Sequence, residues 1–379
     1  MDRHEFWKTQ PVPKIGTKVE KPGTIYAQLP RAFDNPIILP DECEWKTLDI
    51  EDESDLDSLH SFLSEHYVQD TDDRFRLRYS KEFITLLLTQ NDTRSVAAIT
   101  LRETGQIIGC ISYVMTTNVV HGESFQMAEV NFLCIDETFR NKRMAPVLIS
   151  EITRRVTRHG IDKAMYTVGN KIPTPFSVTR YYHRPLNVRF LIDIGFMDCG
   201  DQTMESVEKI YQLPSKMSRN FVRLDESNLE GAYSCFISYV DNGYDCYPDF
   251  SLEEFRHMFL HNDVVRTYVV TDTENSNEVL DFCSYYNLDS TVVSDGSIMR
   301  AANLFYYSCN NTDLRMICLN LMIEAKNRGI DVFNATDMGE NLKILSDLRF
   351  ISGTGVSYYY MYNYRVPPIV PTKIFKIIP

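Results

Sequence analysis

A short basic turn is the segment of this sequence with the clearest chemical use. Arg140, Lys142 and Arg143 follow an apolar run that ends at Ile135, and a helical pattern begins near Ala145. Backbone N–H groups at a helix start attract anions, and Lys and Arg side chains add positive charge. We interpret the turn as a cradle for a pyrophosphate, with a solvated helix start as the alternative. The GxxxxGK[ST] and GxGxxG patterns are absent, which disfavours a P-loop or a dinucleotide fold.

Acidic side chains gather in a second short segment, which contains Asp70, Asp72 and Asp73. Such a run is usually a solvated face. The whole chain of 379 residues is also acidic, with 39 Lys and Arg against 52 Asp and Glu and a formal net charge of −13. This balance disfavours nucleic acid and anionic membranes as partners, and it suits a cationic partner.

Patterns for metal sites, disulfides and membrane spans are weak. His257 and His261 form an i,i+4 pair without the glutamate of HExxH, so we expect an ordinary helix face and no metal. Nine scattered cysteines without a CxxC pair indicate free thiols in a reducing cytosol. No apolar run approaches the roughly 18 residues of a membrane span, and the N-terminus lacks a signal-peptide core. We therefore expect a cytoplasmic protein without a membrane span.

An internal duplication predicts the elements that position these residues. GCISY (109–113) aligns with FCSYY (282–286), and HGID (159–162) aligns with RGID (328–331) at nearly the same offset. Each half shows the same order of two helices, three strands, a long helix and a closing strand. We predict two related α/β halves, with chance similarity of helix and strand patterns as the alternative.

The predicted elements follow from hydrophobic period and capping residues. In the first half they are a helix capped by Ser54, a helix over 80–90, strands over 94–101, 107–115 and 125–135, a helix over 145–159 and a strand over 163–168. In the second half they are a helix capped by Asp225, a helix over 251–261, strands over 265–271, 278–286 and 299–308, a helix over 312–328 and a strand over 331–335. A strand-like segment, 207–214, joins the halves. The first half carries about 15 extra residues including 171–187, which we expect to be a functional loop, with a passive surface loop as the alternative.

The strand, basic turn and helix together resemble the acyl-CoA site of GNAT-type acyltransferases. In that fold the turn reads Gln/Arg-x-x-Gly-x-Gly/Ala. The segment from Arg140 to Ala145 keeps both ends of the pattern, but Arg143 stands where glycine is usual. This departure points to a specialised branch of the fold.

Longer stretches are similar to the N-myristoyltransferase family, whose members acylate an N-terminal glycine. The matching stretches are FWKTQPVPK (6–14), HYVQDTDDRFRLRYS (66–80), EVNFLCI (129–135), KRMAPVLISEITRRV (142–156), MYTVG (165–169), RYYHRPLN (180–187), DVFNATDM (331–338) and YYYMYNY (358–364). The resemblance implies a mixed α/β (α+β) fold of two tandem GNAT-like halves, related by a pseudo-twofold axis around a mixed β-sheet. It implies that residues 1–210 bind acyl-CoA, and that residues 211–379 bind the peptide and return the C-terminal tail to the active site.

The resemblance also assigns the catalytic groups. Backbone N–H groups of Phe132 and Leu133, at a break in strand pairing, would bind the thioester oxygen where negative charge develops. The C-terminal carboxylate on Pro379 would take a proton from the amine, because only the neutral amine attacks. Family chains usually end in Leu or Gln. The fixed φ of proline affects the direction in which this carboxylate points. The residues that would hold the amine are Asn131, Thr167 and Tyr79.

Two further sets of contacts are implied by the resemblance. Myristoyl-CoA is the co-substrate, no prosthetic group is needed, and its contacts would be Phe6, Trp7, Lys8, Phe132, Leu133, Cys134, Ile135, Arg140, Lys142, Arg143, Met144, Ala145 and Pro146. The peptide, with Ser or Thr and a basic residue after its glycine, would contact Tyr67, Asp70, Asp72, Phe75, Tyr79, Tyr181, His183, Tyr286 and Asp337. Gln69 replaces a usual acid beside this acidic segment. Almost nothing precedes FWKTQ, so we expect a free cytosolic monomer.

Two other functions remain open from the sequence. The first is an acyltransferase with a different chain length or a Lys acceptor, because residue types do not measure the depth of an apolar pocket. The second is a non-catalytic protein that binds acyl-CoA or a lipopeptide, for which the unusual Pro379 ending is the support.

Overall fold

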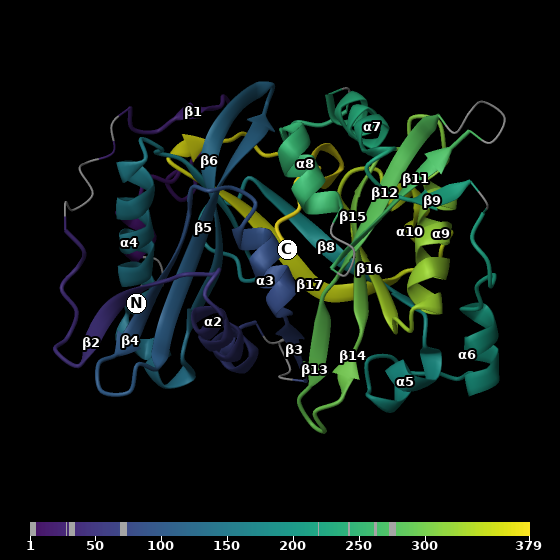
Figure 1. Cartoon of the computed structure of the whole chain (residues 1–379), viewed down its shortest axis with the longest axis horizontal. Coiled ribbons are helices and arrows are strands. Elements are labelled where there is room, and N and C mark those ends of the chain that lie inside the picture. Colours follow the sequence, from purple (N-terminus) through teal and green to yellow (C-terminus); the bar gives the residue numbers. More distant parts are fainter. Residues whose placement is uncertain are drawn as a thin grey trace.

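One large mixed sheet organises the chain, as Figure 1 shows for the computed structural model. The structure describes residues 5–27, 29, 35–68, 74–218, 220–241, 243–260, 264–272 and 278–379. Within them, the 13-stranded sheet runs in the order β2-β4-β5-β6-β7-β17-β8-β16-β15-β12-β11-β9, and β10 (Cys246–Pro248) pairs with β5. Its first-half strands are β2 (Cys43–Leu48), β4 (Arg94–Leu101), β5 (Ile107–Val120), β6 (Glu123–Ile135), β7 (Ala164–Val168) and β8 (Ser177–Pro185). Its second-half strands are β9 (Phe221–Arg223), β11 (Val265–Thr271), β12 (Val279–Asn287), β15 (Ala301–Tyr307), β16 (Val332–Thr336) and β17 (Ile351–Tyr362).

The order of strands reads the same from both edges of this sheet. From either edge, three antiparallel pairings are followed by one parallel pairing, β6 with β7 and β15 with β16. The two central strands, β17 and β8, are antiparallel to each other. This symmetry confirms the predicted fold class of two related halves around a mixed sheet.

The halves exchange their last strands at the centre. β17 comes from the second half and lies between β7 and β8, whereas β8 comes from the first half and lies between β17 and β16. The expectation of a loop over 171–187 is therefore wrong for most of that segment. Its sequence SVTRYYHRP is rich in β-branched and aromatic residues, which suit a pleated strand.

Helices flank the large sheet on both sides (Figure 1). They are α1 (Glu5–Lys8), α2 (Glu53–His66), α3 (Lys81–Leu88), α4 (Met144–Arg158), α5 (Val188–Asp193), α6 (Met204–Ile210), α7 (Leu229–Asp241), α8 (Leu252–Phe259), α9 (Leu314–Asn327) and α10 (Leu342–Leu345), with 3₁₀ helices η1 (Glu137–Lys142) and η2 (Pro371–Lys373). The N-cap of α2 is Asp52 rather than Ser54, because the Asp52 side chain accepts the Asp55 N–H. The strand-like prediction over 207–214 is also wrong, since Thr203 caps α6 by accepting the Ser206 N–H.

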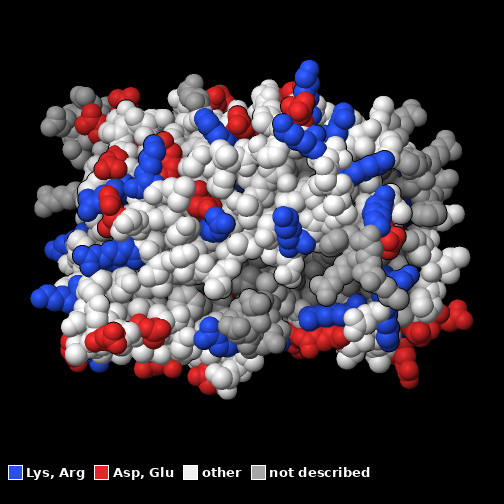
Figure 2. All heavy atoms as spheres, turned by 180° about the vertical axis from the view of Figure 1, so that it is seen from behind, with Lys and Arg blue, Asp and Glu red and all other residues white. Residues whose placement is uncertain are grey.

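Two small sheets and the cysteines complete the architecture. β14 (Ile298–Met299), β13 (Asp289–Val292) and β3 (Phe75–Arg78) form a three-stranded sheet that joins the two halves, and β1 (Gly23–Thr24) pairs with β18 (Tyr364–Arg365). All nine cysteines are free thiols, as the sequence predicted. In the view of Figure 2, acidic side chains line much of the lower edge of the molecule, and acidic and basic side chains are mixed over the rest of that face.

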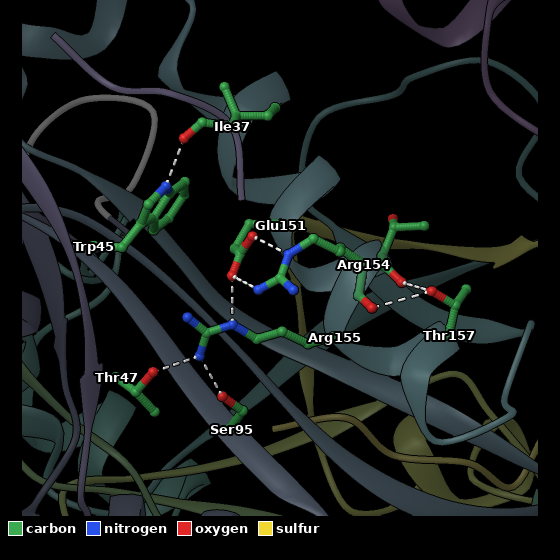
Figure 3. Close-up of polar contacts among 9 residues, drawn as sticks. Ile37, Trp45, Thr47, Ser95, Glu151, Arg154, Arg155 and Thr157 are labelled. Atoms are coloured by element: carbon green, nitrogen blue, oxygen red, sulfur yellow. Dashed lines mark hydrogen bonds and ion pairs between the residues drawn. The ribbon is translucent and has the colours of Figure 1, made fainter. Parts of the chain in front are cut away.

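A buried ionic cluster fixes α4 against the sheet. Glu151 accepts hydrogen bonds of 2.6 and 2.7 Å from Arg154 and one of 2.8 Å from Arg155 (Figure 3). Arg155 also donates to Thr47 on β2 at 2.9 Å and to Ser95 on β4 at 2.7 Å. Burial favours a raised pKa for Glu151, but the hydrogen bonds from the two arginines outweigh it and hold its pKa below the ordinary value. The cluster therefore positions the helix that follows the basic turn.

Candidate active site

A cavity of about 1560 Å³ is lined by residues from both halves. Its walls include β6, β7 and α4 from the first half, β12, β16 and β17 from the second half, and the strand β8. The last two residues, Ile378 and Pro379, also line it. The exchanged strands thus place residues distant in sequence around one space.

A β-bulge lies at the centre of the cavity wall. Cys110 pairs with Cys134 and Ser112 with Asn131, so two residues of β6, Phe132 and Leu133, lie opposite one residue of β5. Phe132 has a φ of 52°. This conformation is rare for a bulky residue and costs about 1–3 kcal/mol. A bulge leaves backbone groups outside the ladder, so Phe132 and Leu133 can present N–H groups to a ligand.

Side chains of β5 and two tyrosines hold the bulge in place. Ser112 Oγ donates to the Asn131 carbonyl at 3.0 Å, and Cys110 Sγ donates to the Phe132 carbonyl at 3.3 Å. The buried Phe132 ring packs against Tyr67 and Tyr79, with ring centroids 5.8 and 5.2 Å apart. Burial raises the pKa of Tyr67, and an interaction with the Phe132 backbone offsets only part of that rise. The bulge is therefore supported on both faces.

The C-terminal tail is packed along the cavity rather than frayed. The Phe375 N–H donates to the Cys246 carbonyl at 2.8 Å, and the Tyr359 hydroxyl donates to the Lys376 carbonyl at 2.9 Å. The Ile377 N–H donates to the Tyr306 hydroxyl at 3.0 Å. These bonds place Pro379 at the cavity that Asn131 and Thr167 also line.

The basic turn has the backbone geometry of an anion cradle. Arg143, where glycine is usual in GNAT turns, ends η1 in the left-handed conformation with a φ of 57°, and α4 begins at Met144 without a side-chain cap. Arg140 donates to the carbonyls of His66 and Ile135 at 2.8 and 3.3 Å, so part of its hydrogen-bonding capacity holds the turn. The uncapped N–H groups of α4 remain to meet an anionic ligand.

The structure brings together most of the residues expected to contact acyl-CoA. Those lining the cavity are Phe6, Trp7, Phe132, Leu133, Cys134, Ile135, Arg140, Ala145 and Pro146. Those outside the lining are Lys8, Lys142, Arg143 and Met144. Lys142 instead places its ammonium 4.1 Å from the centre of the Phe139 ring.

The residues expected to contact the peptide divide in the same way. Those lining the cavity are Tyr67, Phe75, Tyr79, Tyr181, His183 and Tyr286. Asp337 lies outside the lining, and its carboxylate accepts the Arg180 N–H at 2.8 Å. Asp70 and Asp72, together with Gln69 and Asp73, lie outside the residues that the structure describes.

Two cavity residues that the sequence did not single out, Asn334 and Asn303, form a polar relay with His183, and a third, Gly353, lies beside its ring. His183 Nδ1 lies 2.7 Å from Asn334 Oδ1, and Asn334 Nδ2 donates to Asn303 Oδ1 at 3.1 Å. A Cβ added to Gly353 would lie 2.3 Å from His183 Nε2, so only glycine fits beside this ring. Asn334 could have been found from the sequence, because it lies within the matched stretch 331–338. Asn303 is brought beside it only by pairing between strands.

The described residues form neither a metal-binding cluster nor a membrane-spanning helix. In that part of the chain, no group of three or more His, Cys, Asp and Glu side chains could hold a metal ion. His257 Nε2 lies 2.9 Å from the Leu86 carbonyl, and His261 lies outside the described residues. None of the described helices is long and apolar enough to cross a membrane.

Comparison with known families and structures agrees with this architecture. Family models described as the N-terminal and C-terminal domains of myristoyl-CoA:protein N-myristoyltransferase match residues 26–179 and 193–375. A glycylpeptide N-tetradecanoyltransferase of Kluyveromyces lactis is 34% identical over 97% of this chain and 87% of its own length. One of Candida albicans is 35% identical over 97% of this chain and 86% of its own length.

A crystal structure of Saccharomyces cerevisiae N-myristoyltransferase with bound myristoyl-CoA superimposes with a TM-score of 0.93 at 30% identity, covering 100% of both chains. The matched domain models span both halves of the sheet, and the similar structure spans the whole chain. This protein belongs to the N-myristoyltransferase family.

Proposed function

We propose that this protein transfers a myristoyl group from myristoyl-CoA to the amine of an N-terminal glycine. The observation that carries the proposal is that the bulge at Phe132 and Leu133, the side chains of Asn131 and Thr167, and the end of the chain at Pro379 line one cavity. An acyl transfer needs oxyanion donors, an amine site and a base in one place. The names of the related proteins support the same reaction.

Different residues carry out the different steps of the reaction. The N–H groups of Phe132 and Leu133 stabilise the thioester oxygen while the amine nitrogen attacks the carbonyl carbon. The carbon–sulfur bond then breaks, and CoA leaves as the thiolate or thiol. A free α-amino group has a pKa of about 7.7–8.0, so part of it carries an extra proton near neutral pH. The Pro379 carboxylate receives a proton from that amine, and Asn131, Thr167 and Tyr79 hold the nitrogen near the carbonyl carbon.

The two halves take different parts of the substrates. Residues 1–210 hold the acyl-CoA through the basic turn and the start of α4, and residues 211–379 hold most of the peptide. His183 accepts a hydrogen bond from a Ser or Thr hydroxyl downstream of the glycine, and Asp70 and Asp72 attract a following basic residue. The enzyme acts as a monomer in the cytoplasm and uses myristoyl-CoA as a co-substrate without a prosthetic group.

Blocking the terminal carboxylate tests the base. Amidation of Pro379, or one glycine appended after it, removes or displaces the proton acceptor while leaving the cavity walls intact. We expect kcat for a glycine peptide to fall at least about 100-fold, because general bases contribute 10²–10⁴-fold. Acyl-CoA affinity, measured by calorimetry, serves as the control and should not change. Unchanged kcat in the amidated enzyme would exclude the carboxylate as the base.

A further inference from the structure

A buried ion pair joins the C-terminal tail to the strand that carries the bulge. Lys376 Nζ lies 2.6 Å from Glu129 Oε2, and the two side chains are 4% and 10% exposed. Glu129 lies on β6 two residues before Asn131, and Lys376 lies three residues before Pro379. The pair therefore connects the segment that bears the terminal carboxylate to the strand that bears the amine-binding residue.

Glu129 also determines which way the Asn131 amide faces. Asn131 Nδ2 donates to Glu129 Oε1 at 3.4 Å. An ionised carboxylate only accepts hydrogen bonds, so it selects the NH₂ end of the amide and leaves Oδ1 available to the cavity. A substrate amine or ammonium offers N–H donors. The orientation set by Glu129 is thus the one that can bind the amine, whereas the reversed amide would place donor against donor.

Other hydrogen bonds also hold the tail on either side of this pair. The Phe375 N–H donates to the Cys246 carbonyl, and the Ile377 N–H donates to the Tyr306 hydroxyl, on either side of Lys376. Among the described residues, Glu129 Oε2 has no partner besides the Lys376 ammonium. Well-packed apolar residues often stabilise a fold as well as a buried ion pair does. A charged pair at this position therefore points to a role in positioning the reacting groups, in addition to any role in stability.

We propose that Lys376 and Glu129 are positioning residues that act through Asn131 and Pro379. The relay from Lys376 through Glu129 to Asn131 fixes the amine acceptor and the terminal carboxylate relative to each other. This inference rests on the proposed function, because both positioned groups act on the glycine amine. Neither Lys376 nor Glu129 lines the cavity, so their effect reaches the substrate only through these neighbours.

A double substitution separates positioning from structure. Glu129→Met combined with Lys376→Met removes both charges and keeps apolar side chains of similar length. We expect a thermal midpoint and an acyl-CoA Kd close to those of the wild type, and a kcat about 10- to 100-fold lower, as misplacement of reacting groups produces. Glu129→Gln combined with Lys376→Met restores an acceptor for Asn131 without a charge, and should recover part of that kcat.

The matched control is Lys373→Met. Lys373 lies on the same tail, but it is exposed and its ammonium donates to the Gly243 carbonyl at 2.9 Å. We expect this variant to keep the wild-type kcat. A folded double Met variant with wild-type kcat would overturn the proposal. If the double Met variant does not fold, Glu129→Asp keeps the charge and shortens the reach to Asn131, and an unchanged kcat in that enzyme would overturn the proposal as well.

A second readout does not depend on turnover. The Ile377 N–H donates to the Tyr306 hydroxyl, so its hydrogen exchange reports how firmly the tail is held. We expect faster exchange at Ile377 in Lys376→Met than in Lys373→Met. Equal exchange in the two variants would overturn the positioning role. If the wild type acylates no glycine peptide, the proposed function fails, whereas this comparison still decides whether the ion pair holds the tail.

Discussion

His183 illustrates how a few hydrogen bonds determine the chemistry of one residue. Asn334 Nδ2 is engaged with Asn303 Oδ1, so Asn334 Oδ1 must accept from His183 Nδ1. The neutral imidazole therefore carries its proton on Nδ1 and has a lone pair on Nε2. That lone pair is suited to accept a hydrogen bond from a Ser or Thr hydroxyl, which is the group the sequence led us to expect near His183.

The protonation of His183 gives a prediction at this scale. Burial lowers the pKa of His183, and the hydrogen bond with Asn334 opposes part of that effect. The folded state therefore binds fewer protons than the unfolded state just below the ordinary pKa of about 6.5, so this residue reduces stability as the pH falls through that value. NMR of ¹⁵N-labelled imidazole, assigned with His183→Gln, should show a neutral Nδ1–H ring at pH 6.5. A charged ring at that pH would contradict the lowered pKa of His183 and the lone pair on Nε2, because an imidazolium carries protons on both nitrogens.

The proposed catalytic residues could be identified from the sequence mainly through long matched stretches. EVNFLCI identified Phe132 and Leu133, but their types alone describe an ordinary buried strand. Asn303 could not be found in this way, because its partner Asn334 is brought beside it only by the parallel pairing of β15 and β16. Hydrogen bonds between side chains on neighbouring strands depend on register, which a single sequence specifies weakly.

At the scale of elements, the sequence predicted a helix or strand well where local signals define it. It failed where pairing between distant strands defines the element. The strands 94–101 and 265–271 and the long helices were predicted within one or two residues of β4, β11, α4 and α9, because their hydrophobic periods are regular. The segment 171–187 was misread, because the sequence offsets show no counterpart for it in the second half and its strand pairs only with second-half strands. Its β propensity was visible, but its pairing partners were more than 140 residues away in the chain.

The ionic cluster on α4 gives a prediction about stability. Glu151→Gln leaves Arg154 and Arg155 partly buried without their carboxylate, and breaking such a pair costs about 3–5 kcal/mol. We expect urea unfolding to show a loss of this size at pH 7. The exposed pair of Arg189 and Glu208, with hydrogen bonds of 2.7 and 2.8 Å, provides the control, and Glu208→Gln should change stability little.

The pH dependence of the cluster follows from the direction of its pKa shift. The folded-state pKa of Glu151 is lowered, so its contribution is complete above the ordinary pKa of about 4.3 and is lost as the pH falls through the folded value. The stability difference between wild type and Glu151→Gln should therefore shrink on acidification below about pH 4. A difference that stays constant to pH 3 would contradict the ionic explanation.

At the scale of the whole molecule, the duplication and the exchange of strands act together. The register shift opposite Phe132 and Leu133 has a counterpart in β12 and β15, where Cys283 pairs with Tyr307 and Tyr285 with Leu304. The second half thus keeps the irregular pairing. Its Tyr306, at the equivalent place, holds the C-terminal tail instead.

The strand exchange predicts that the halves do not fold independently. A fragment of residues 1–210 would lack β17, which covers β7, and both partners of β8. We expect the full chain to unfold in one cooperative step by both fluorescence and circular dichroism, and the fragment to show no cooperative transition. Co-expression with residues 211–379 should restore it. A fragment that unfolds cooperatively by itself would show that each half is stable without its exchanged strand.

The position of β8 also has a consequence for synthesis on the ribosome. β8 ends at Pro185, but its partners β16 and β17 begin at Val332 and Ile351. At about 5–20 residues per second, translation needs roughly ten to thirty seconds to produce both partners. During this interval the nascent chain carries a strand with two unpaired edges, which is a template for aggregation. The strand β8, at the centre of the finished sheet, thus needs protection by chaperones throughout this interval.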